Sequence, residues 1–175
     1  INDVLDISKI EAGQFELHEE RVDLPEVIKD CLQIVGYEAE NAKIQLLRKV
    51  SPGIGGLLAD QRVIKQILLN LISNSIKYGH ENGQIELIAN RMPNDGIELS
   101  VRDTGLGMSP QEISLALEAY RRIKSKDGVQ KQGTGLGLPL VRSFCRLHDA
   151  RFDIESVKDV GTTVTIAFPA WRNMA

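Results

Sequence analysis

Four polar side chains recur at helical spacing within residues 61–78, a segment otherwise rich in leucine and isoleucine. Asn70, Asn74, Lys77 and Tyr78 stand at positions i, i+4, i+7 and i+8, so one helix would present them on one face. Two carboxamides and an ammonium group form a set of donors and acceptors suited to a hydrated cation and to phosphate oxygens. The row by itself also fits an ordinary solvated helix face, so both interpretations stay open until other motifs are considered.

Two glycine-rich segments follow this row along the chain. Asp103 to Gly107 comes directly after a predicted strand, and its glycines would let the backbone approach a ligand closely. The Asp103 carboxylate could accept a hydrogen bond from an exocyclic amine, or it could cap the loop. Residues 133–138 read Gly-Thr-Gly-Leu-Gly-Leu before a predicted helix, whose free N–H groups and positive end favour a phosphate. No strand precedes residues 133–138, as a Rossmann unit would require.

Hydrophobic periodicity and capping signals place these motifs on a framework of helices and strands. Helices are predicted over residues 1–12, 24–42, 61–78, 110–122 and 136–147. Strands are predicted over residues 14–23, 44–50, 56–59, 84–92, 96–101, 151–157 and 162–168. The segment 125–133 lacks apolar periodicity and is expected to be a mobile loop. Together these elements predict an α/β two-layer sandwich, with helices on one face of a mixed, mainly antiparallel sheet.

The composition is that of a globular domain able to bury one sizeable core, with 175 residues of which 42% are hydrophobic. A formal net charge of −3 gives no basic surface for nucleic acid or for an anionic membrane. No apolar run approaches the roughly 20 residues of a membrane span. Cys31 and Cys145 belong to no metal or redox motif, so two inert thiols in a reducing cytosol are expected.

The chain begins at Ile1 without an initiator methionine or a signal peptide, so we interpret it as a piece of a longer protein. Residues 1–12 carry an apolar stripe at helical spacing that ends at Gly13. The stripe fits either a bundle or coiled coil with an upstream helix, or a helix that folds back onto the domain. The sequence leaves these two interpretations open.

The order of the motifs resembles the catalytic and ATP-binding domain of bacterial sensor histidine kinases. That domain belongs to the Bergerat-fold superfamily, with gyrase, heat-shock chaperone and mismatch-repair ATPases. Residues 70–78 (NLISNSIKY) resemble the N box of the family, residues 103–107 (DTGLG) its G1 box, and residues 133–138 (GTGLGL) its G2 box. Residues 1–13 are similar to the end of the second dimerisation helix. The resemblance thus divides the chain into this helix end, 1–13, and a catalytic and ATP-binding domain, 14–175.

The resemblance implies that the N-box residues bind ATP and Mg²⁺. Asn74 matches the magnesium ligand, and Asn70 lies one turn earlier, near the metal and the phosphates. Lys77 matches a phosphate contact, and Tyr78 an aromatic wall against the nucleotide. Few protein ligands are needed because magnesium keeps several of its waters.

The same resemblance implies that the glycine segments bind the base and the phosphates. Asp103 matches the carboxylate that accepts a hydrogen bond from adenine N6, Gly105 and Gly107 line the base pocket, and Thr162 is expected to support Asp103 through water. The lid residues expected to wrap the phosphates are Gly133, Thr134, Gly135, Leu136 and Gly137.

Catalysis is expected to involve Asn70, Lys77 and an arginine. Hydrolytic members of the superfamily carry a glutamate near the position of Asn70 that activates water, and an amide cannot take a proton. Asn70 therefore favours transfer of the γ-phosphoryl group over hydrolysis. Arg122 is the best match for the arginine that contacts the γ-phosphate, with Arg121 as the alternative, beside Tyr120 in an atypical lid.

The function implied is that of an ATP-dependent protein-histidine kinase of a two-component system, in a fragment without its phosphoacceptor. The acceptor histidine would precede Ile1, and His18, His80 and His148 are expected to be surface or capping residues. The implied partners are ATP or ADP, the dimerisation domain of the same kinase, a second copy in a full-length homodimer, and a response regulator. A cytoplasmic location is expected, even for a membrane-anchored kinase. The atypical lid leaves open a nucleotide-binding pseudokinase that acts through protein contacts.

Because Asn70 cannot act as a base, purified protein should hydrolyse ATP far more slowly than about one turnover per second, the low end of ordinary enzyme rates. Release of phosphate under steady-state conditions measures this rate. Fast turnover by the purified chain would contradict the assignment of Asn70 to a transferase.

Overall fold

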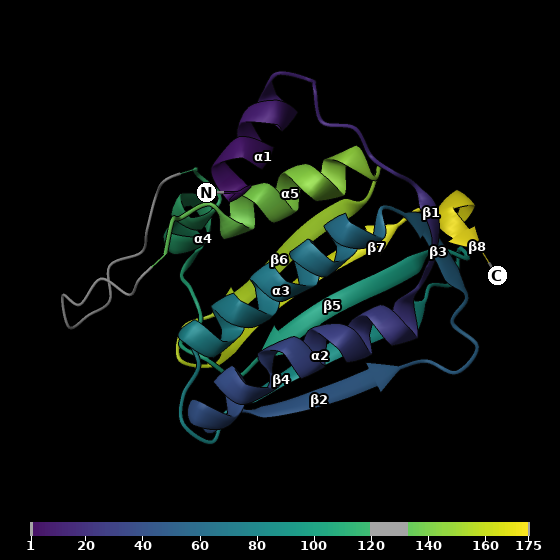
Figure 1. Cartoon of the computed structure of the whole chain (residues 1–175). Coiled ribbons are helices and arrows are strands. Elements are labelled where there is room, and N and C mark those ends of the chain that lie inside the picture. The colour runs from purple at the N-terminus through teal and green to yellow at the C-terminus, as the bar shows by residue number, and fades with distance from the viewer. Residues whose placement is uncertain (1, 120–132, 175) are drawn as a thin grey trace.

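The computed structural model describes residues 2–119 and 133–174, which form a layer of helices on one face of a sheet (Figure 1). The helices are α1 (Asn2–Glu11), α2 (Leu24–Asn41), α3 (Gln61–Lys77), α4 (Pro110–Ala116) and α5 (Gly137–Leu147), with a 3-10 turn, η1, at Ala170–Arg172. The strands are β1 (Glu20–Asp23), β2 (Gln45–Val50), β3 (Gly56–Ala59), β4 (Gln84–Arg91), β5 (Ile97–Asp103), β6 (Arg151–Val157), β7 (Gly161–Phe168) and β8 (Asn173–Met174).

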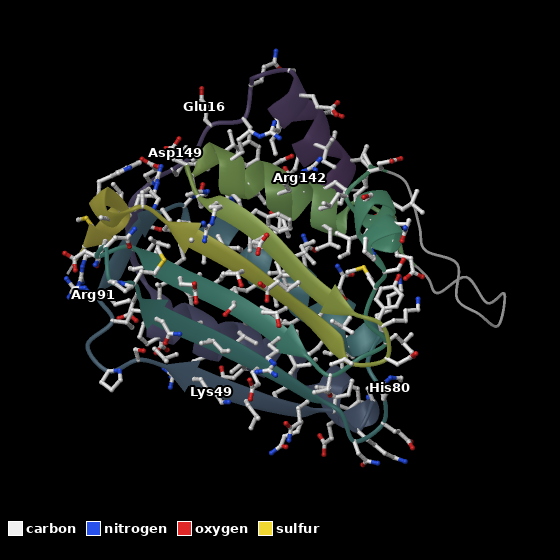
Figure 2. The ribbon with its side chains drawn as sticks, turned by 180° about the vertical axis from the view of Figure 1, so that it is seen from behind. Glu16, Lys49, His80, Arg91, Arg142 and Asp149 are labelled. Carbon is white, nitrogen blue, oxygen red and sulfur yellow. The ribbon has the colours of Figure 1, made fainter. Side chains whose placement is uncertain are left out.

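The main sheet has five strands in the order β2-β4-β5-β7-β6. Only β2 and β4 pair in parallel, and the other neighbours are antiparallel. Figure 1 shows α2, α3 and α5 side by side on one face. Figure 2 shows the sheet from the opposite face, which the described helices leave uncovered, with Lys49 of β2 labelled. Lys49 forms an ion pair with Glu86 of β4. The predicted two-layer α/β sandwich with a mainly antiparallel sheet is therefore confirmed.

The core lies between the sheet and the helical layer. Strand β4 alternates between buried and partly exposed residues, as expected for a strand with one face on the core. Helix α3 lies over it and buries an apolar stripe at helical spacing. The buried residues of α3 are Val63, Ile64, Ile67, Leu68, Leu71, Ile72, Ser75 and Ile76.

Several predicted boundaries are wrong. The segment predicted as one strand over 14–23 is a strand only from Glu20, and it joins a second, three-stranded sheet of order β1-β3-β8 that the sequence did not predict. The helix predicted to reach residue 122 ends at Ala116, with Leu117 as its C-cap. The predicted mobile loop, 125–133, lies outside the described residues except for Gly133.

Helix α1 folds back onto α5, where Ile7 is buried. Its Asp3 and Asp6 carboxylates accept hydrogen bonds from the Gln66 amide on α3. The predicted stripe faces elsewhere, because Val4 and Leu5 are 39% and 54% exposed. One face of this segment thus packs on the domain, as expected for a helix that folds back, and its pairing with an upstream helix stays a prediction. Across residues 2–119 and 133–174, no helix is long and apolar enough to cross a membrane.

Both cysteines are buried and unpaired, as predicted for inert thiols. Burial raises the pKa of Cys31 to about 11, against a smaller opposing effect of Lys65. Burial raises the pKa of Cys145 to about 12. Since the thiolate is the reactive form, neither residue is suited to redox chemistry or metal binding at neutral pH.

A buried histidine joins the end of α5 to the start of α3. His148 is the C-cap of α5 and is fully buried, so the expectation of a capping residue holds and that of a surface residue does not. Its Nδ1 donates to the Phe144 carbonyl at 2.8 Å, and its Nε2 accepts from the Asp60 N–H at 3.2 Å. These two bonds require the neutral ring, and burial, with the nearby Arg172 cation, lowers the pKa of His148.

Acid should therefore weaken the fold through His148. Below the ordinary pKa of 6.5, the unfolded chain takes up a proton that the folded ring resists, so stability is lost as the pH falls from about 6.5 towards the lowered pKa. We expect the melting temperature to fall between pH 7.5 and pH 5. His148→Gln should melt lower at pH 7.5 but change less with pH, and equal slopes for the two proteins would contradict this role.

Candidate functional site

The predicted polar row occupies the C-terminal half of α3. Asp60 caps the helix, because its carboxylate accepts from the N–H groups of Arg62 at 3.0 Å and Val63 at 3.3 Å. The apolar stripe beneath the row fixes the rotation of the helix about its axis. The four residues of the row are half-buried: Asn70, Asn74, Lys77 and Tyr78. The predicted helix is thus confirmed, and its four polar side chains share one face.

Asp103 is the last residue of β5, directly beside Thr162 on β7. Its Oδ1 accepts from the Gly105 N–H at 2.9 Å and the Thr162 N–H at 3.3 Å. Its Oδ2 accepts from the Ser75 hydroxyl at 2.8 Å. The sequence predicts support from Thr162 through water, whereas the structure shows a direct bond from its backbone. The Thr162 hydroxyl lies 2.7 Å from Ser156 Oγ.

The loop after Asp103 lies between the end of α3 and the β6–β7 turn. The Leu106 N–H donates to the Tyr78 carbonyl at 3.1 Å, and the Leu106 carbonyl accepts from the Asp159 N–H at 2.7 Å. A Cβ on Gly105 would stand 2.6 Å from the Tyr78 carbonyl oxygen. Gly107 has φ +61°, and a Cβ there would stand 1.9 Å from the Val157 carbonyl oxygen. Glycine is therefore required for this loop to pack against both neighbours.

An ion pair holds the far side of this loop. Ser109 and Glu112 form a reciprocal capping box at the start of α4. The Lys158 ammonium, on the β6–β7 turn, contacts both carboxylate oxygens of Glu112, at 2.6 and 2.7 Å. Hydrogen bonding from Lys158 is the main reason that the pKa of Glu112 lies below its usual range. Helix α4 is thereby tied to the β6–β7 turn.

The second glycine segment lies against the polar row. A Cβ on Gly133 would stand 2.7 Å from the Lys77 ammonium nitrogen, and one on Gly137 would stand 3.4 Å from the Asn74 amide nitrogen. Gly135 has φ +72°, a left-handed conformation that glycine adopts without strain. The Thr134 hydroxyl accepts from the Leu136 N–H at 3.3 Å. Leu136 is fully buried, so its side chain belongs to the core and not to the lining of the site.

The groups gathered here fit a magnesium nucleotide. The Asn70 amide nitrogen is buried and has no hydrogen-bond partner within the described part of the chain, which is unusual for such a group. Helix α5 begins beside Asn74, and no side chain of the described residues caps it, so its positive N-terminal end can attract an anion. The Lys77 ammonium lies 5.0 Å from the centre of the Tyr78 ring, which places a cation at the same end. Carboxamide oxygens are hard ligands of the kind magnesium prefers.

Some predicted residues cannot be placed, and one important residue was not predicted. Tyr120, Arg121 and Arg122 lie outside the described residues. Ser75 donates a hydrogen bond to Asp103, but it was missed because serine is common in helices and belongs to none of the predicted motifs as a ligand. Its position on the apolar face of α3 was the available signal, because a buried hydroxyl needs a partner.

A separate cavity of about 740 Å³ opens at the other end of α3, and none of the predicted site residues lines it. Its walls include Asp60 and Lys65, whose charges are already engaged: Asp60 by Arg62 and by the His18 N–H, and Lys65 by Asp30. Because these two charges are already paired, neither is well placed to bind a charged ligand. The chemistry therefore favours the glycine-lined end of α3 as the functional site.

Solved structures of histidine kinases have the same fold. Full-length ShkA in complex with AMPPNP matches with a TM-score of 0.83 and 27% identity, over 96% of this chain and 34% of that one. The mycobacterial sensor histidine kinase MprB matches with a TM-score of 0.72 and 25% identity, over 86% of this chain and 97% of that one. The fold and the gathered motifs together define a catalytic domain of the histidine-kinase class.

The chain belongs to the family of histidine kinase-, DNA gyrase B- and HSP90-like ATPases, whose sequence profile matches residues 59–172. Histidine protein kinase DivJ of Caulobacter vibrioides is 39% identical over 97% of this chain and 28% of its own length. Cell-division control histidine kinase PdhS of Brucella canis is 35% identical over the whole of this chain and 18% of its own length. The chain thus corresponds to less than a third of each of these two relatives.

Gly107 and Gly36 form a matched pair for testing the loop. Gly107→Ala should destabilise the protein by at least about 2 kcal/mol, because alanine disfavours the left-handed conformation and its Cβ would meet Val157. Gly36→Ala, on an open face of α2, should stabilise it by about 0.5–1 kcal/mol. Urea unfolding measures both changes. Equal stability of the two variants would show that the loop does not require glycine at 107.

Proposed function

We propose that this chain is the ATP-binding catalytic domain of a two-component sensor histidine kinase. It binds ATP with Mg²⁺ and transfers the γ-phosphoryl group to a histidine on a dimerisation domain. The observation that carries the proposal is that Asn74 and Lys77, on α3, lie so close to the glycine segment 133–137 that a Cβ on Gly133 or Gly137 would meet them. Carboxamides, a cation and the N-terminal end of α5 lie close together there. The names of the relatives, all histidine kinases, support the same activity.

The base is assigned to the Asp103 end of the site. Three donors hold its carboxylate, which accepts a hydrogen bond from the exocyclic amine of adenine. Gly105 and Gly107 bring the loop backbone close to the ring, and Tyr78 lies at the junction between the base and the phosphates. Thr162 contributes its backbone N–H to Asp103.

The phosphate end is assigned to the polar row and the second glycine segment. Asn74 is the proposed magnesium ligand, with Asn70 one turn earlier near the metal and phosphates. Magnesium, when bound, neutralises charge on the phosphate oxygens. Lys77 and the backbone of Gly133, Thr134, Gly135, Leu136 and Gly137 provide the remaining positive groups. We retain Arg122 as the proposed arginine at the γ-phosphate.

Transfer is favoured over hydrolysis by the chemistry at position 70. The buried amide of Asn70 can donate or accept a hydrogen bond but cannot remove a proton from water. Catalysis by these residues consists of positioning and charge neutralisation. The names of the relatives favour a kinase over the pseudokinase alternative.

The wider assignment follows from the same proposal. Residues 1–13 would be the end of the second dimerisation helix, with residues 14–175 as the catalytic domain. The exposed Val4 and Leu5 support this division, because a bundle would cover them. The full-length protein would be a homodimer that passes the phosphoryl group to a response regulator. Both reactions would occur in the cytoplasm.

The test supplies a dimerisation domain to this chain with γ-labelled ATP. The chain alone should remain unlabelled, and the added domain should become labelled on histidine. Asn74→Ala should lower the affinity for Mg-ATP at least about tenfold, because it removes a contact to a charged group. Its affinity for ATP measured with excess EDTA should change much less.

Asn41→Ala is the matched control, since Asn41 is an exposed asparagine at the end of α2, away from the polar row. It should leave both affinities unchanged. Label on the chain itself, or unchanged Mg-ATP affinity in Asn74→Ala, would refute the proposal.

A further inference from the structure

We infer that Ser75 is a positioning residue that orients Asp103 towards the 6-amino group of adenine and so sets the preference of the site for that base. The inference rests on the proposed function, because it assumes that Asp103 receives the base. It adds a determinant of specificity that lies on α3 and not on the loop of Asp103 itself.

The hydroxyl of Ser75 is directed in an unusual way for a serine in a helix. Serines within helices commonly bond back to the carbonyl four residues earlier. Ser8 and Ser114 do this, with bonds to the carbonyls of Val4 and Pro110. Ser75 is 7% exposed and instead reaches across to the sheet, where its Oγ lies 2.8 Å from Asp103 Oδ2. The bond therefore joins two layers of the fold.

The donors around Asp103 leave one place for a ligand. Each carboxylate oxygen accepts about two hydrogen bonds. Among the described residues, Oδ1 already accepts from the backbone N–H groups of Gly105 and Thr162, whereas Oδ2 accepts only from Ser75. The remaining capacity is thus on Oδ2, the oxygen that Ser75 holds. An incoming amine would share that oxygen with the serine hydroxyl.

Ser75 also fixes the plane of the carboxylate. The two N–H groups hold Oδ1 but leave Oδ2 free to turn about it, and the hydroxyl removes that freedom. A carboxylate held before binding loses less conformational entropy when the base arrives. Removal of the hydroxyl should therefore cost affinity only for ligands that carry the amine.

The experiment compares ATP with the triphosphate of purine riboside, which has the same ring and phosphates but no 6-amino group. The wild-type protein should bind ATP more tightly than this analogue. Ser75→Ala should weaken ATP binding about tenfold and leave analogue binding within about twofold. Alanine is smaller and favours helix, so α3 should fold normally, as the melting temperature would show. Ser75→Thr keeps the hydroxyl and should keep the preference for ATP.

Ser73→Ala is the matched control, because Ser73 lies on the same helix and its hydroxyl makes no hydrogen bond to any described residue. It should leave both affinities unchanged. If Ser75→Ala weakens ATP and analogue equally, or neither, Ser75 does not act through the amine and the inference is overturned. If the wild-type protein itself does not distinguish the two ligands, the assignment of the base to Asp103 fails instead.

Discussion

The carboxylate of Asp103 is the constraint on which the base end of this domain depends. Three segments donate to it: the loop that follows it through Gly105, and two segments distant in the sequence, α3 through Ser75 and β7 through Thr162. A partly buried charge is tolerated only when such donors surround it. Of these bonds, the one from Ser75 joins the helical layer to the sheet. The bond from Ser75 thus both positions the Asp103 carboxylate and holds α3 against the sheet.

Helix α3 connects two parts of the molecule with different chemistry. Its N-cap, Asp60, accepts a hydrogen bond from the His18 N–H before β1 and donates its own N–H to His148 after α5. These bonds fix the start of the helix to two other segments. Its last turns carry carboxamides and an ammonium group that lie beside the glycine segment 133–137. The buried apolar stripe runs along the helix from Val63 to Ile76. It holds the whole helix on the core, so the fixed start of the helix also fixes the position of the polar residues at its end.

The sequence was sufficient for the framework and for most of the site. Strong hydrophobic periodicity predicted α3 and both hairpins of the main sheet. Each of these elements buries one face, so the period can be recognised within a single continuous segment. The small sheet was missed because its pairing joins residues 20–23, 56–59 and 173–174, and strands of four and two residues carry almost no pattern. Ser75 was missed because its partner is 28 residues away. The burial of the Leu136 side chain could not be predicted, because a glycine-rich motif does not show which side chains turn inward.

The small sheet has a further consequence for how the domain can be built into larger proteins. Strands β1 and β8 flank β3, so the path of the chain into the sandwich and the path out of it lie at the same end (Figure 1). The Arg172 guanidinium closes this end by bonding Glu19 at 2.6 Å and the Leu58 carbonyl at 2.8 Å. The start of β1 and the end of the chain are thus joined near the Ile97 end of β5, and Asp103 is the residue at the other end of that strand. The segments that precede β1 and follow β8 can therefore vary in length and sequence with little effect on the residues that face the ligand.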